Sequence, residues 1–416
     1  MAASTKAEII ATGSELLGPD RLDTNSLFLT EKLNEAGFEV HLKTVVGDDE
    51  DSISRVMESA LRRSSLIVLS GGLGPTEDDV TRQAVARVLG RRLRTDQNVI
   101  GVIRMRFASR GVIMPKINER QAQVIEGAQI LSNPLGTAPG MWIETEGARI
   151  ALLPGPPREL QTMFLQSVMP RLEACGSGRR LARRSLQIVG MTESEVDSYA
   201  APLYKSCRDV ETTILAGSAQ ISLHLSQWIS PGEEPSRLEE LAARLREGLG
   251  DAVYSDRGES LETVIGALLR ERGHTLAVAE SCTSGILAAR LTRVPGSSDY
   301  FLGGILCYSD GIKRMLCGVS SEILEKHGAV SAETAEALAR GVRRACDSSL
   351  GLSVTGIAGP GGGTGEKPVG LVFVGLADTN GSFSEKRLIP GDRESVRERA
   401  ATLALARLRL FLLRRS

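Results

Sequence analysis

Residues 275–285 read Thr275-Leu276-Ala277-Val278-Ala279-Glu280-Ser281-Cys282-Thr283-Ser284-Gly285. The apolar run from Thr275 to Ala279 predicts a buried strand, and the small residues after it lead into a helical stretch. This order places Ser281 at a strand-to-helix turn, where its hydroxyl can face a ligand. On this motif alone, a serine that only caps a helix beside turn glycines fits equally well.

Three later segments favour the catalytic interpretation. They read Cys307-Tyr308-Ser309-Asp310-Gly311-Ile312-Lys313, Thr355-Gly356-Ile357-Ala358-Gly359-Pro360-Gly361-Gly362-Gly363 and Lys367-Pro368-Val369-Gly370. A serine, a tyrosine and a lysine near glycine-rich turns can make a hydrolase that needs no histidine. The four histidines, His41, His224, His274 and His327, all lie outside these motifs. A Ser-His-Asp triad is therefore not supported.

Each of these residues can be given a role. Ser281 would be the nucleophile, and Lys313 would take its proton once it is removed from water. Tyr308 would relay the proton or position the substrate. Cys282 is a rival nucleophile, although its place on the turn predicts that it points inward. The plainer alternatives are that Lys313 is a solvated helix residue and that Tyr308 lies on a rim.

Backbone groups in the same motifs predict a cradle for anionic oxygens. The N–H groups around Ser281 to Thr283, together with the backbone from Gly356 through Gly359 to Gly362, can hold an oxyanion and a phosphate. Arg393 follows Gly391-Asp392 at the start of the last helix and can pair bidentately with a phosphate. A surface ion pair is the alternative for Arg393.

A second glycine-rich loop lies near the N-terminus. It reads Ser70-Gly71-Gly72-Leu73-Gly74-Pro75-Thr76-Glu77-Asp78-Asp79, between an apolar strand and a helix. Glycines let backbone N–H groups approach anionic oxygens, and two aspartates can hold a divalent metal that bridges a pyrophosphate. It is not a Walker loop, because no Gly-Lys-Ser or Gly-Lys-Thr follows. A capped turn, with Asp78 and Asp79 in the first helical turn, explains the segment equally well.

The composition narrows the class of protein. The chain has 416 residues, 42% hydrophobic and 24% charged, with a net charge of -1. This is typical of a soluble globular protein, and nucleic-acid binding has no global electrostatic support, since the chain has no overall basic charge. The six cysteines include no Cys-x-x-Cys pair, so we expect free thiols in the cytoplasm and no zinc site. No membrane segment is predicted.

Apolar periodicity predicts alternating strands and helices. Strands are expected over 8–11, 39–46, 66–69, 148–153, 186–189, 221–225, 275–279, 352–354, 369–376 and 383–388. Helices are expected over 24–36, 51–63, 158–168, 192–203, 238–249, 260–271 and 331–346, and from 391 onward. This order predicts parallel sheets with covered faces, and a linker at 175–178. Thr192 with Glu195 predicts a capping box.

The segments from Leu261 to Leu410 resemble the C-terminal domain of the CinA (competence/damage-inducible protein) family. Stand-alone members of that domain are nicotinamide mononucleotide amidohydrolases, so the resemblance implies an amidase with no cofactor. The family pattern is Glu-Ser-Cys-Thr-Gly-Gly, and Ser284 replaces the first of its two glycines. Because glycine permits backbone angles and ligand approach that serine restricts, this change bears on activity and not on the fold.

The N-terminal part, from Ala7 to Pro157, resembles the other CinA domain, which is similar to molybdopterin-binding proteins. The motifs are Thr12-Gly13-Ser14-Glu15-Leu16-Leu17, the loop Gly71 to Asp79, Asn133-Pro134-Leu135-Gly136-Thr137-Ala138-Pro139-Gly140 and Pro154-Gly155-Pro156-Pro157. The resemblance implies an ADP-ribose pyrophosphatase that needs a divalent metal such as Mg, Mn or Co.

The same resemblance assigns roles in the N-terminal site. Asp78 and Asp79 would be catalytic or metal-binding carboxylates, with Glu15 and Glu159 as weaker candidates. Phosphates would be lined by four residues of the loop, Gly71, Gly72, Gly74 and Thr76. Asn25 would meet the ribose, although a helix-cap role is favoured for it from its position.

We therefore predict an α/β protein of three domains. Residues 1–172 would form the molybdopterin-binding-like parallel-sheet domain, 173–256 a KH-type α+β middle domain, and 257–416 the CinA amidohydrolase domain. The middle domain has no Gly-x-x-Gly loop, so a structural spacer is favoured over nucleic-acid binding. The expected partners are nicotinamide mononucleotide, ADP-ribose and a second copy of the chain. The rivals are a molybdopterin-binding or transfer module and a non-enzymatic competence or DNA-damage-related partner.

Overall fold

The computed structural model describes residues 5–175, 178–217 and 219–414. Two of the four residues of the predicted linker at 175–178, residues 176 and 177, lie outside the described residues. The chain forms two compact units, residues 1–181 with 228–234, and residues 182–227 with 235–416. Each unit is considered by itself. The boundaries predicted at 172/173 and 256/257 stay predictions.

A six-stranded sheet forms the centre of the first unit. Its strands, in spatial order, are β2 (Glu39–Val46), β1 (Lys6–Thr12), β3 (Leu66–Ser70), β8 (Arg149–Leu153), β7 (Gly140–Glu144) and β6 (Gln129–Leu131). The first four are parallel, as predicted, whereas β7 is antiparallel to β8 and β6 is antiparallel to β7. The change of direction follows from the connection, because a tight turn closed by Thr145 and Ala148 joins β7 directly to β8.

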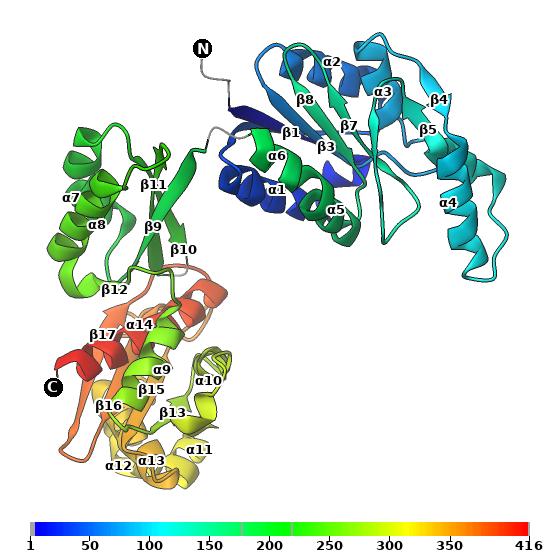
Figure 1. Cartoon of the computed structure of the whole chain (residues 1–416). Helices are drawn as coiled ribbons and strands as arrows, with labels where there is room; N and C mark the ends of the chain where they lie inside the picture. Colours follow the sequence, from blue (N-terminus) through cyan, green and yellow to red (C-terminus); the bar gives the residue numbers. More distant parts are fainter. Residues whose placement is uncertain (1–4, 176–177, 218, 415–416) are drawn as a thin grey trace. The chain divides into compact units, whose positions relative to one another are not determined.

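Helices cover both faces of this sheet (Figure 1). One face carries α1 (Thr24–Glu35), α5 (Pro157–Met163) and α6 (Met169–Cys175), and the other carries α2 (Glu50–Leu61), α3 (Thr81–Val88) and α4 (Gln97–Ala108). Alternate strand residues face opposite layers, since Ile9 packs toward α1 and Ile10 toward α2. Both faces are buried, which explains the continuous apolar run of β3.

A four-stranded sheet and two helices make up the middle of the chain. The order is β10 (Glu211–Gly217), β11 (Gln220–Ile229), β9 (Arg180–Val189) and β12 (Val253–Ser255), and the helices are α7 (Glu193–Ser206) and α8 (Ser236–Leu249). The predicted capping box of Thr192 and Glu195 is confirmed. The edge strand β10 was not predicted, because its exposed and half-buried residues give no apolar run.

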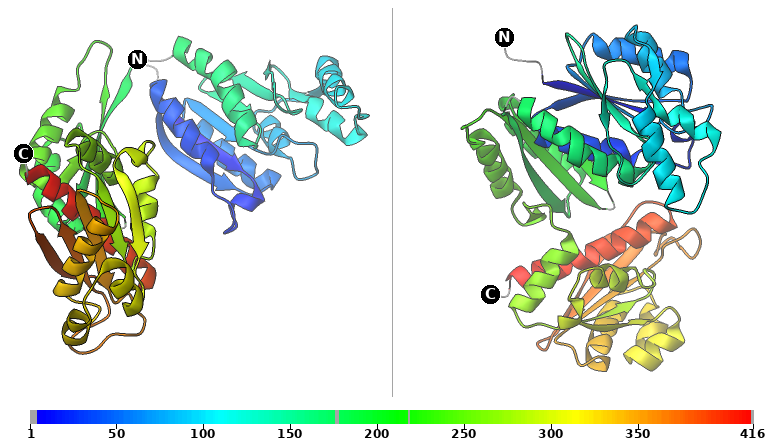
Figure 2. Two further views of the ribbon diagram at one scale, coloured as in Figure 1. Left: turned by 90° about the horizontal axis from the view of Figure 1, so that it is seen from below. Right: turned by 45° about the vertical axis from the view of Figure 1, so that its right-hand side comes forward.

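The C-terminal sheet has five strands. Their order is β14 (Phe301–Leu306), β13 (Leu276–Glu280), β15 (Leu350–Gly356), β16 (Leu371–Ala377) and β17 (Ser382–Leu388). The first three are parallel, β16 is antiparallel to β15, and β17 is antiparallel to β16. One face packs on α9 (Leu261–Glu271), α10 (Ile286–Thr292) and α14 (Arg393–Arg414), and the other on α11 (Asp310–Cys317), α12 (Ser321–His327) and α13 (Ala332–Ala345) (Figures 1 and 2).

The predicted helix caps Ser260 and Ser331 are confirmed. Ser260 and Ser331 each accept an N–H three residues on, from Thr263 and Thr334, at 3.2 Å. The helix predicted over 158–168 is wrong at its end, because a π-helical turn, Phe164–Val168, carries it on into α6. The remaining short elements are β4 (Leu93–Thr95), β5 (Gln123–Ile125) and the 3₁₀ turns Ser14–Leu16, Lys116–Ala122, Gly250–Ala252 and Ser297–Asp299. Within the described residues, no helix is long and apolar enough to cross a bilayer.

Candidate active sites

The N-terminal loop leaves β3 with glycines that the backbone requires. Gly71 and Gly72 have φ angles of 103° and 64°, in the region that favours glycine. A Cβ on Gly71 would lie 2.1 Å from the Thr12 carbonyl oxygen, and one on Gly72 would lie 2.1 Å from Thr81 Oγ1. The loop therefore sits tightly against β1 and the start of α3, and no side chain fits at either position.

Only some N–H groups of this loop are free to donate a hydrogen bond to a ligand. Gly71 N–H donates to the Leu153 carbonyl at 3.0 Å and is already used. The N–H groups of Gly72, Leu73 and Gly74 have no acceptor among the described residues. The predicted phosphate cradle therefore begins at Gly72, and Gly71 serves only the turn.

A buried arginine holds the loop from below. The Arg82 guanidinium donates to the carbonyls of Leu73 and Gly74, at 2.7 and 2.8 Å. Burial lowers the pKa of Arg82 to about 10, so it stays charged at neutral pH. This positive charge lies next to the cradle and favours an anion there. The sequence around Arg82, which lies on the short helix α3, did not indicate this role.

The loop forms one wall of a cavity of about 680 Å³. Besides the loop, the cavity is lined by three predicted residues from distant segments: Asn25, Glu15 and Glu159. Asp78 and Asp79 also line it, whereas Thr76 does not. Thr76 instead donates to Asp79 Oδ2, through its N–H at 2.9 Å and its hydroxyl at 2.5 Å. Thr76 thus positions Asp79.

The favoured helix-cap role of Asn25 is wrong. Asp23 caps α1 by accepting the Ser26 N–H at 2.9 Å, and Asn25 is the second residue of the helix. Asn25 Nδ2 donates to the Gly155 carbonyl at 2.8 Å, while its buried Oδ1 has no partner among the described residues. Likewise, Asp78 and Asp79 precede α3, which begins only at Thr81.

Glu159 is fixed by the Asn133 motif. Asn133 Nδ2 donates to Glu159 Oε2 at 2.7 Å, and its Oδ1 accepts the Gly136 N–H at 2.7 Å. Arg106, from α4, donates to the carbonyls of Asn133, Pro134 and Gly136 and so clamps this turn. The segment therefore presents one carboxylate to the cavity in a fixed position.

The donor set of this cavity fits a hard divalent cation with a phosphate ligand. Six carboxylates line it against a single arginine, Arg21; they are Glu15, Asp23, Asp48, Asp78, Asp79 and Glu159. Such an excess of negative charge repels a pyrophosphate unless a cation compensates it. Within the described residues, no three His, Cys, Asp or Glu side chains converge to make a complete metal cage. A metal would therefore be held by one or two carboxylates with substrate oxygens and water, as Mg²⁺ commonly is.

The second candidate site lies where three parallel strands end. Glu280, the last residue of β13, is in register with Leu306 of β14 on one side and Val354 of β15 on the other. The carboxyl ends of parallel strands share one edge, so the residues that follow them lie together. Ser281 follows β13, Tyr308 follows β14, and the turn to Gly359 follows β15.

Two charged residues that the sequence did not indicate hold the Ser281 turn. The buried Glu280 carboxylate accepts the N–H groups of Gly285, Leu287 and Ala288, at 2.9, 3.1 and 2.8 Å. From α14, Arg397 donates to the carbonyls of Cys282 and Thr283, both at 3.2 Å. The turn is therefore fixed at both ends before any substrate binds.

The oxyanion cradle differs from the prediction in one group. The Ser281 N–H donates to the Val354 carbonyl at 3.0 Å, so it is not available. The N–H groups of Cys282, Thr283 and Ser284 have no acceptor among the described residues, so the last two remain candidate donors to an oxyanion. The Thr283 side chain is fully buried, with its hydroxyl unpartnered in the described structure, so only its backbone can meet a substrate.

Lys313 is buried, so the alternative that it is a solvated helix residue is wrong. Its relative exposure is 1%, although it lies on α11 among exposed neighbours. Nζ donates to the Tyr308 carbonyl at 3.1 Å and lies 3.8 Å from Asp310 Oδ1. Lys313 is therefore buried although its neighbours in sequence are exposed. Its amine lies just after the end of β14, the strand next to the one that precedes Ser281.

Arg393 joins two other predicted residues. Its Nη2 donates to the exposed Tyr308 hydroxyl at 3.2 Å, and its Nη1 donates to the Gly359 carbonyl at 2.6 Å. Gly356 has a different role, because a Cβ there would lie 2.8 Å from the Leu371 carbonyl oxygen. Gly356 is required by sheet packing, whereas Gly359 and Arg393 lie at the candidate site.

Cys282 points into the core, as predicted. Burial raises the pKa of its thiol to about 12, so the reactive thiolate is scarce at neutral pH. We expect Cys282 to resist iodoacetamide in the native protein at about pH 8 and to become reactive only as the pH approaches that raised pKa. The exposed Cys175 is the internal control and should be alkylated. Mass spectrometry of the peptides checks this, and rapid labelling of native Cys282 would contradict it.

Two family models match this chain. Residues 258–412 match "CinA C-terminal domain", and residues 8–174 match "Probable molybdopterin binding domain". The CinA-like protein of Solibacter usitatus is 47% identical over 404 residues, 97% of each chain. The CinA-like protein of Koribacter versatilis is 47% identical over 412 residues, 98% of this chain and 100% of its own. The crystal structure of the protein CinA from Thermoplasma acidophilum is 32% identical and covers 40% of this chain and 97% of its own, with a TM-score of 0.37.

Proposed function

The chain belongs to the CinA family, and on that premise we propose that it is a hydrolase with two activities on pyridine-nucleotide breakdown products. The C-terminal part deamidates nicotinamide mononucleotide to nicotinate mononucleotide and ammonia. The N-terminal part hydrolyses ADP-ribose to AMP and ribose 5-phosphate with a divalent metal. The protein works as a cytoplasmic homodimer in this proposal.

The observation that carries the amidase proposal is the buried Lys313 beside the strand edge that holds Ser281. In the first step, Ser281 Oγ attacks the carboxamide carbon while the Lys313 amine takes the hydroxyl proton. The oxyanion that forms accepts the free N–H groups of Thr283 and Ser284. Collapse releases ammonia with a proton from Lys313, and water then hydrolyses the acyl-enzyme to the carboxylate.

The pyrophosphatase proposal is supported by the acidic cavity and the three free N–H groups of its loop. The amides from Gly72 to Gly74 bind phosphate oxygens, and the positive charge of Arg82, beside the same loop, strengthens that attraction. When bound, the divalent metal supplies charge compensation at the pyrophosphate. Asp78 and the free Oδ1 of Asp79 are the carboxylates that would hold it.

Asp79→Asn is expected to lower ADP-ribose hydrolysis by about 10²-fold or more, because it removes half of the proposed metal-binding charge. Thr76 can still hold the remaining amide oxygen, so the loop should fold normally. The measurement is AMP formation with Mg²⁺ or Mn²⁺. Ammonia release from nicotinamide mononucleotide, which uses another part of the chain, should not change. Unaltered ADP-ribose hydrolysis would remove Asp79 from the site.

Ser284→Gly is expected to raise amidase turnover roughly fivefold, the rate equivalent of about 1 kcal/mol, because it removes a side chain that crowds the cradle. Ser284 has a φ of 48°, and its hydroxyl donates to the Ser281 carbonyl at 3.1 Å. Glycine adopts this conformation freely and leaves the neighbouring amides more open.

The matched control for this change is Asp347→Gly. Asp347 also has a positive φ, 50°, but lies outside the motifs. Asp347→Gly should alter the thermal midpoint of unfolding without altering kcat for ammonia release. Equal effects of both substitutions on kcat, or a slower Ser284→Gly enzyme, would show that crowding by the Ser284 side chain does not limit turnover.

One experiment tests both activities. The purified protein is incubated with ADP-ribose plus divalent metals and, separately, with nicotinamide mononucleotide, and the products are identified by mass. The second candidate function, molybdopterin binding by the first unit, is favoured by the family match over 8–174. Tight binding of a molybdopterin without ADP-ribose turnover would favour it, and a protein without either turnover or binding would fit a non-enzymatic partner.

A further inference from the structure

A polar cavity of about 510 Å³ in the second unit contains none of the proposed amidase groups. Its walls come from the β10–β11 strands and from α9, α10 and α14, and it is lined by Leu215, Ala216, Gly217, Gln220, Ser222, Glu262, Ile286, Ala289, Arg290, Arg293, Glu398 and Thr402. The sheet that contains these strands also contacts α14 at its far edge, where Asp251 and Val253 lead into and begin β12. Arg409 donates to the Asp251 and Val253 carbonyls at 2.6 and 2.7 Å.

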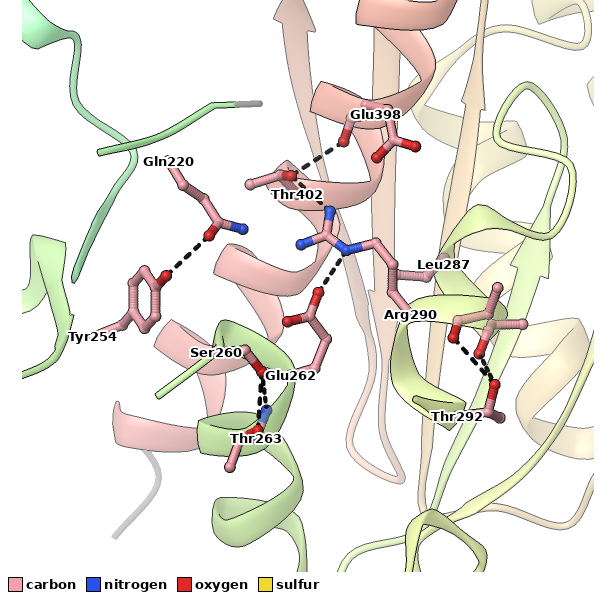
Figure 3. A network of polar contacts seen from close by, with 12 residues as sticks. Gln220, Tyr254, Ser260, Glu262, Thr263, Leu287, Arg290, Thr292, Glu398 and Thr402 are labelled. Carbon is pink, nitrogen blue, oxygen red and sulfur yellow. Dashed lines mark hydrogen bonds and ion pairs between the residues drawn. The ribbon is translucent and has the colours of Figure 1, made fainter. Parts of the chain in front are cut away.

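Arg290 lines this cavity and belongs to a network of polar contacts with Glu262 and Thr402 (Figure 3). Only 9% of its side chain is exposed, and it is held at two of its three nitrogens. Nε donates to Glu262 Oε1 at 2.5 Å, and Nη1 donates to Thr402 Oγ1 at 2.7 Å. Among the described residues, the third nitrogen, Nη2, has no acceptor. A fixed guanidinium with one open N–H edge is a ready donor to an anionic oxygen.

Two more charges line the same cavity without an ion-pair partner in the described part of the chain. They are Arg293, at the end of α10, and Glu398, on α14. Arg290 and Glu262 neutralise each other, so the free charges are one cation and one anion. A simple anion or cation would leave one of them uncompensated, whereas a ligand with both charges would match both.

An adjoining cavity of about 450 Å³ shares four lining residues with the first: Ala216, Gly217, Gln220 and Thr402. Its own lining is mainly apolar and includes Val189, Ile221, Leu388 and Leu403, while Glu193, Glu195, Arg387 and Arg399 also lie on its walls. Apolar surface of this kind is stabilised when a hydrophobic group covers it. The two cavities together therefore present paired charges next to a hydrophobic pocket.

We propose that these two cavities bind a small zwitterion with an apolar tail, of the class of α-amino acids with aliphatic or aromatic side chains. The carboxylate meets Arg290 Nη2 and Arg293, the ammonium meets Glu398, and the side chain enters the adjoining cavity. The site is distinct from the strand edge that carries Ser281, although α10 and α14 pass through both regions.

The test is isothermal titration of the full chain with L-leucine and L-phenylalanine, beside glycine, acetate and methylammonium. Saturable binding is expected for at least one of the two apolar amino acids, with weaker binding of glycine, which lacks the tail. Acetate and methylammonium, which carry one charge each, should not compete. The Arg293→Ala/Glu398→Gln variant should bind at least about tenfold more weakly, because two charge-assisted contacts are lost.

Arg290 is tested with a variant that leaves no buried charge alone, Glu262→Gln/Arg290→Met, which should also lose binding while keeping its thermal midpoint near that of the wild type. Ser281→Ala should bind the amino acids normally, so the result is independent of the amidase proposal. Absence of saturable binding of both amino acids at millimolar concentrations would overturn the inference. So would equal binding by Arg293→Ala/Glu398→Gln, or full competition by acetate alone.

Discussion

Ser281→Ala should abolish ammonia release from nicotinamide mononucleotide, with a loss of about 10⁴-fold or more in kcat, because no oxygen nucleophile remains on the turn. The turn itself should survive. Its geometry depends on Glu280, on Arg397 and on the Ser281 backbone N–H, none of which uses the serine hydroxyl. Steady-state ammonia assays measure the loss, and a crystal structure or unchanged thermal midpoint shows that the fold is kept.

Cys282→Ala is the matched control, one residue along the same turn. Its thiol is buried and protonated at neutral pH, so its removal should leave most of the turnover. ADP-ribose hydrolysis should be the same in both variants. If instead Cys282→Ala were inactive and Ser281→Ala active, the nucleophile would be the thiol, and the orientation of the turn during catalysis would differ from the one described here.

The elements that carry Ser281 were predictable because their signals are local. The run from Thr275 to Ala279 gives a buried strand, and the small residues after it give the turn. That Tyr308 lies near this turn follows once both strands are placed in one parallel sheet, since their carboxyl ends share an edge. This inference needs only the order of strands and turns along the chain.

The supports of the turn could not be predicted in the same way. Arg397 reaches the Cys282 carbonyl from a helix more than a hundred residues later in the chain. In the sequence of α14, Arg397 is one of several arginines that would be expected on the surface. Only the packing of α14 against the sheet brings it to the turn. Glu280 is part of the quoted motif, yet its three N–H contacts depend on the path of the turn into α10.

The N-terminal loop shows the same division between local and distant information. Its glycines were recognised from the pattern alone, and the close approach of Gly71 to Thr12 explains them. Which of their N–H groups are free was not predictable, because the acceptor for Gly71 is the end of β8, distant in sequence. Asn25 was misjudged for a related reason, since Asp23 competes for the cap and leaves Asn25 to contact Gly155.

Lys313→Met should lower amidase kcat by about 10²–10⁴-fold, the usual range for loss of a general base. Methionine keeps much of the buried aliphatic stem, so the packing of α11 should change little. The lost contact to the Tyr308 carbonyl is a single hydrogen bond of 3.1 Å, too small an effect to explain such a decrease by destabilisation alone. The exposed Lys326→Met, on α12, is the control and should keep full turnover.

Lys313→Arg separates the role of a base from that of a structural donor. Arginine keeps the positive charge and can still donate to the Tyr308 carbonyl, but it does not give up its proton at neutral pH. If Lys313 takes the Ser281 proton, the arginine variant should be as impaired as the methionine variant. In Lys313→Ala, added methylamine should restore part of the turnover, because a free amine can then occupy the space and accept the proton. An active Lys313→Arg enzyme, without rescue of the alanine variant by amine, would mean that the lysine only holds the Tyr308 backbone, and that another group activates the serine.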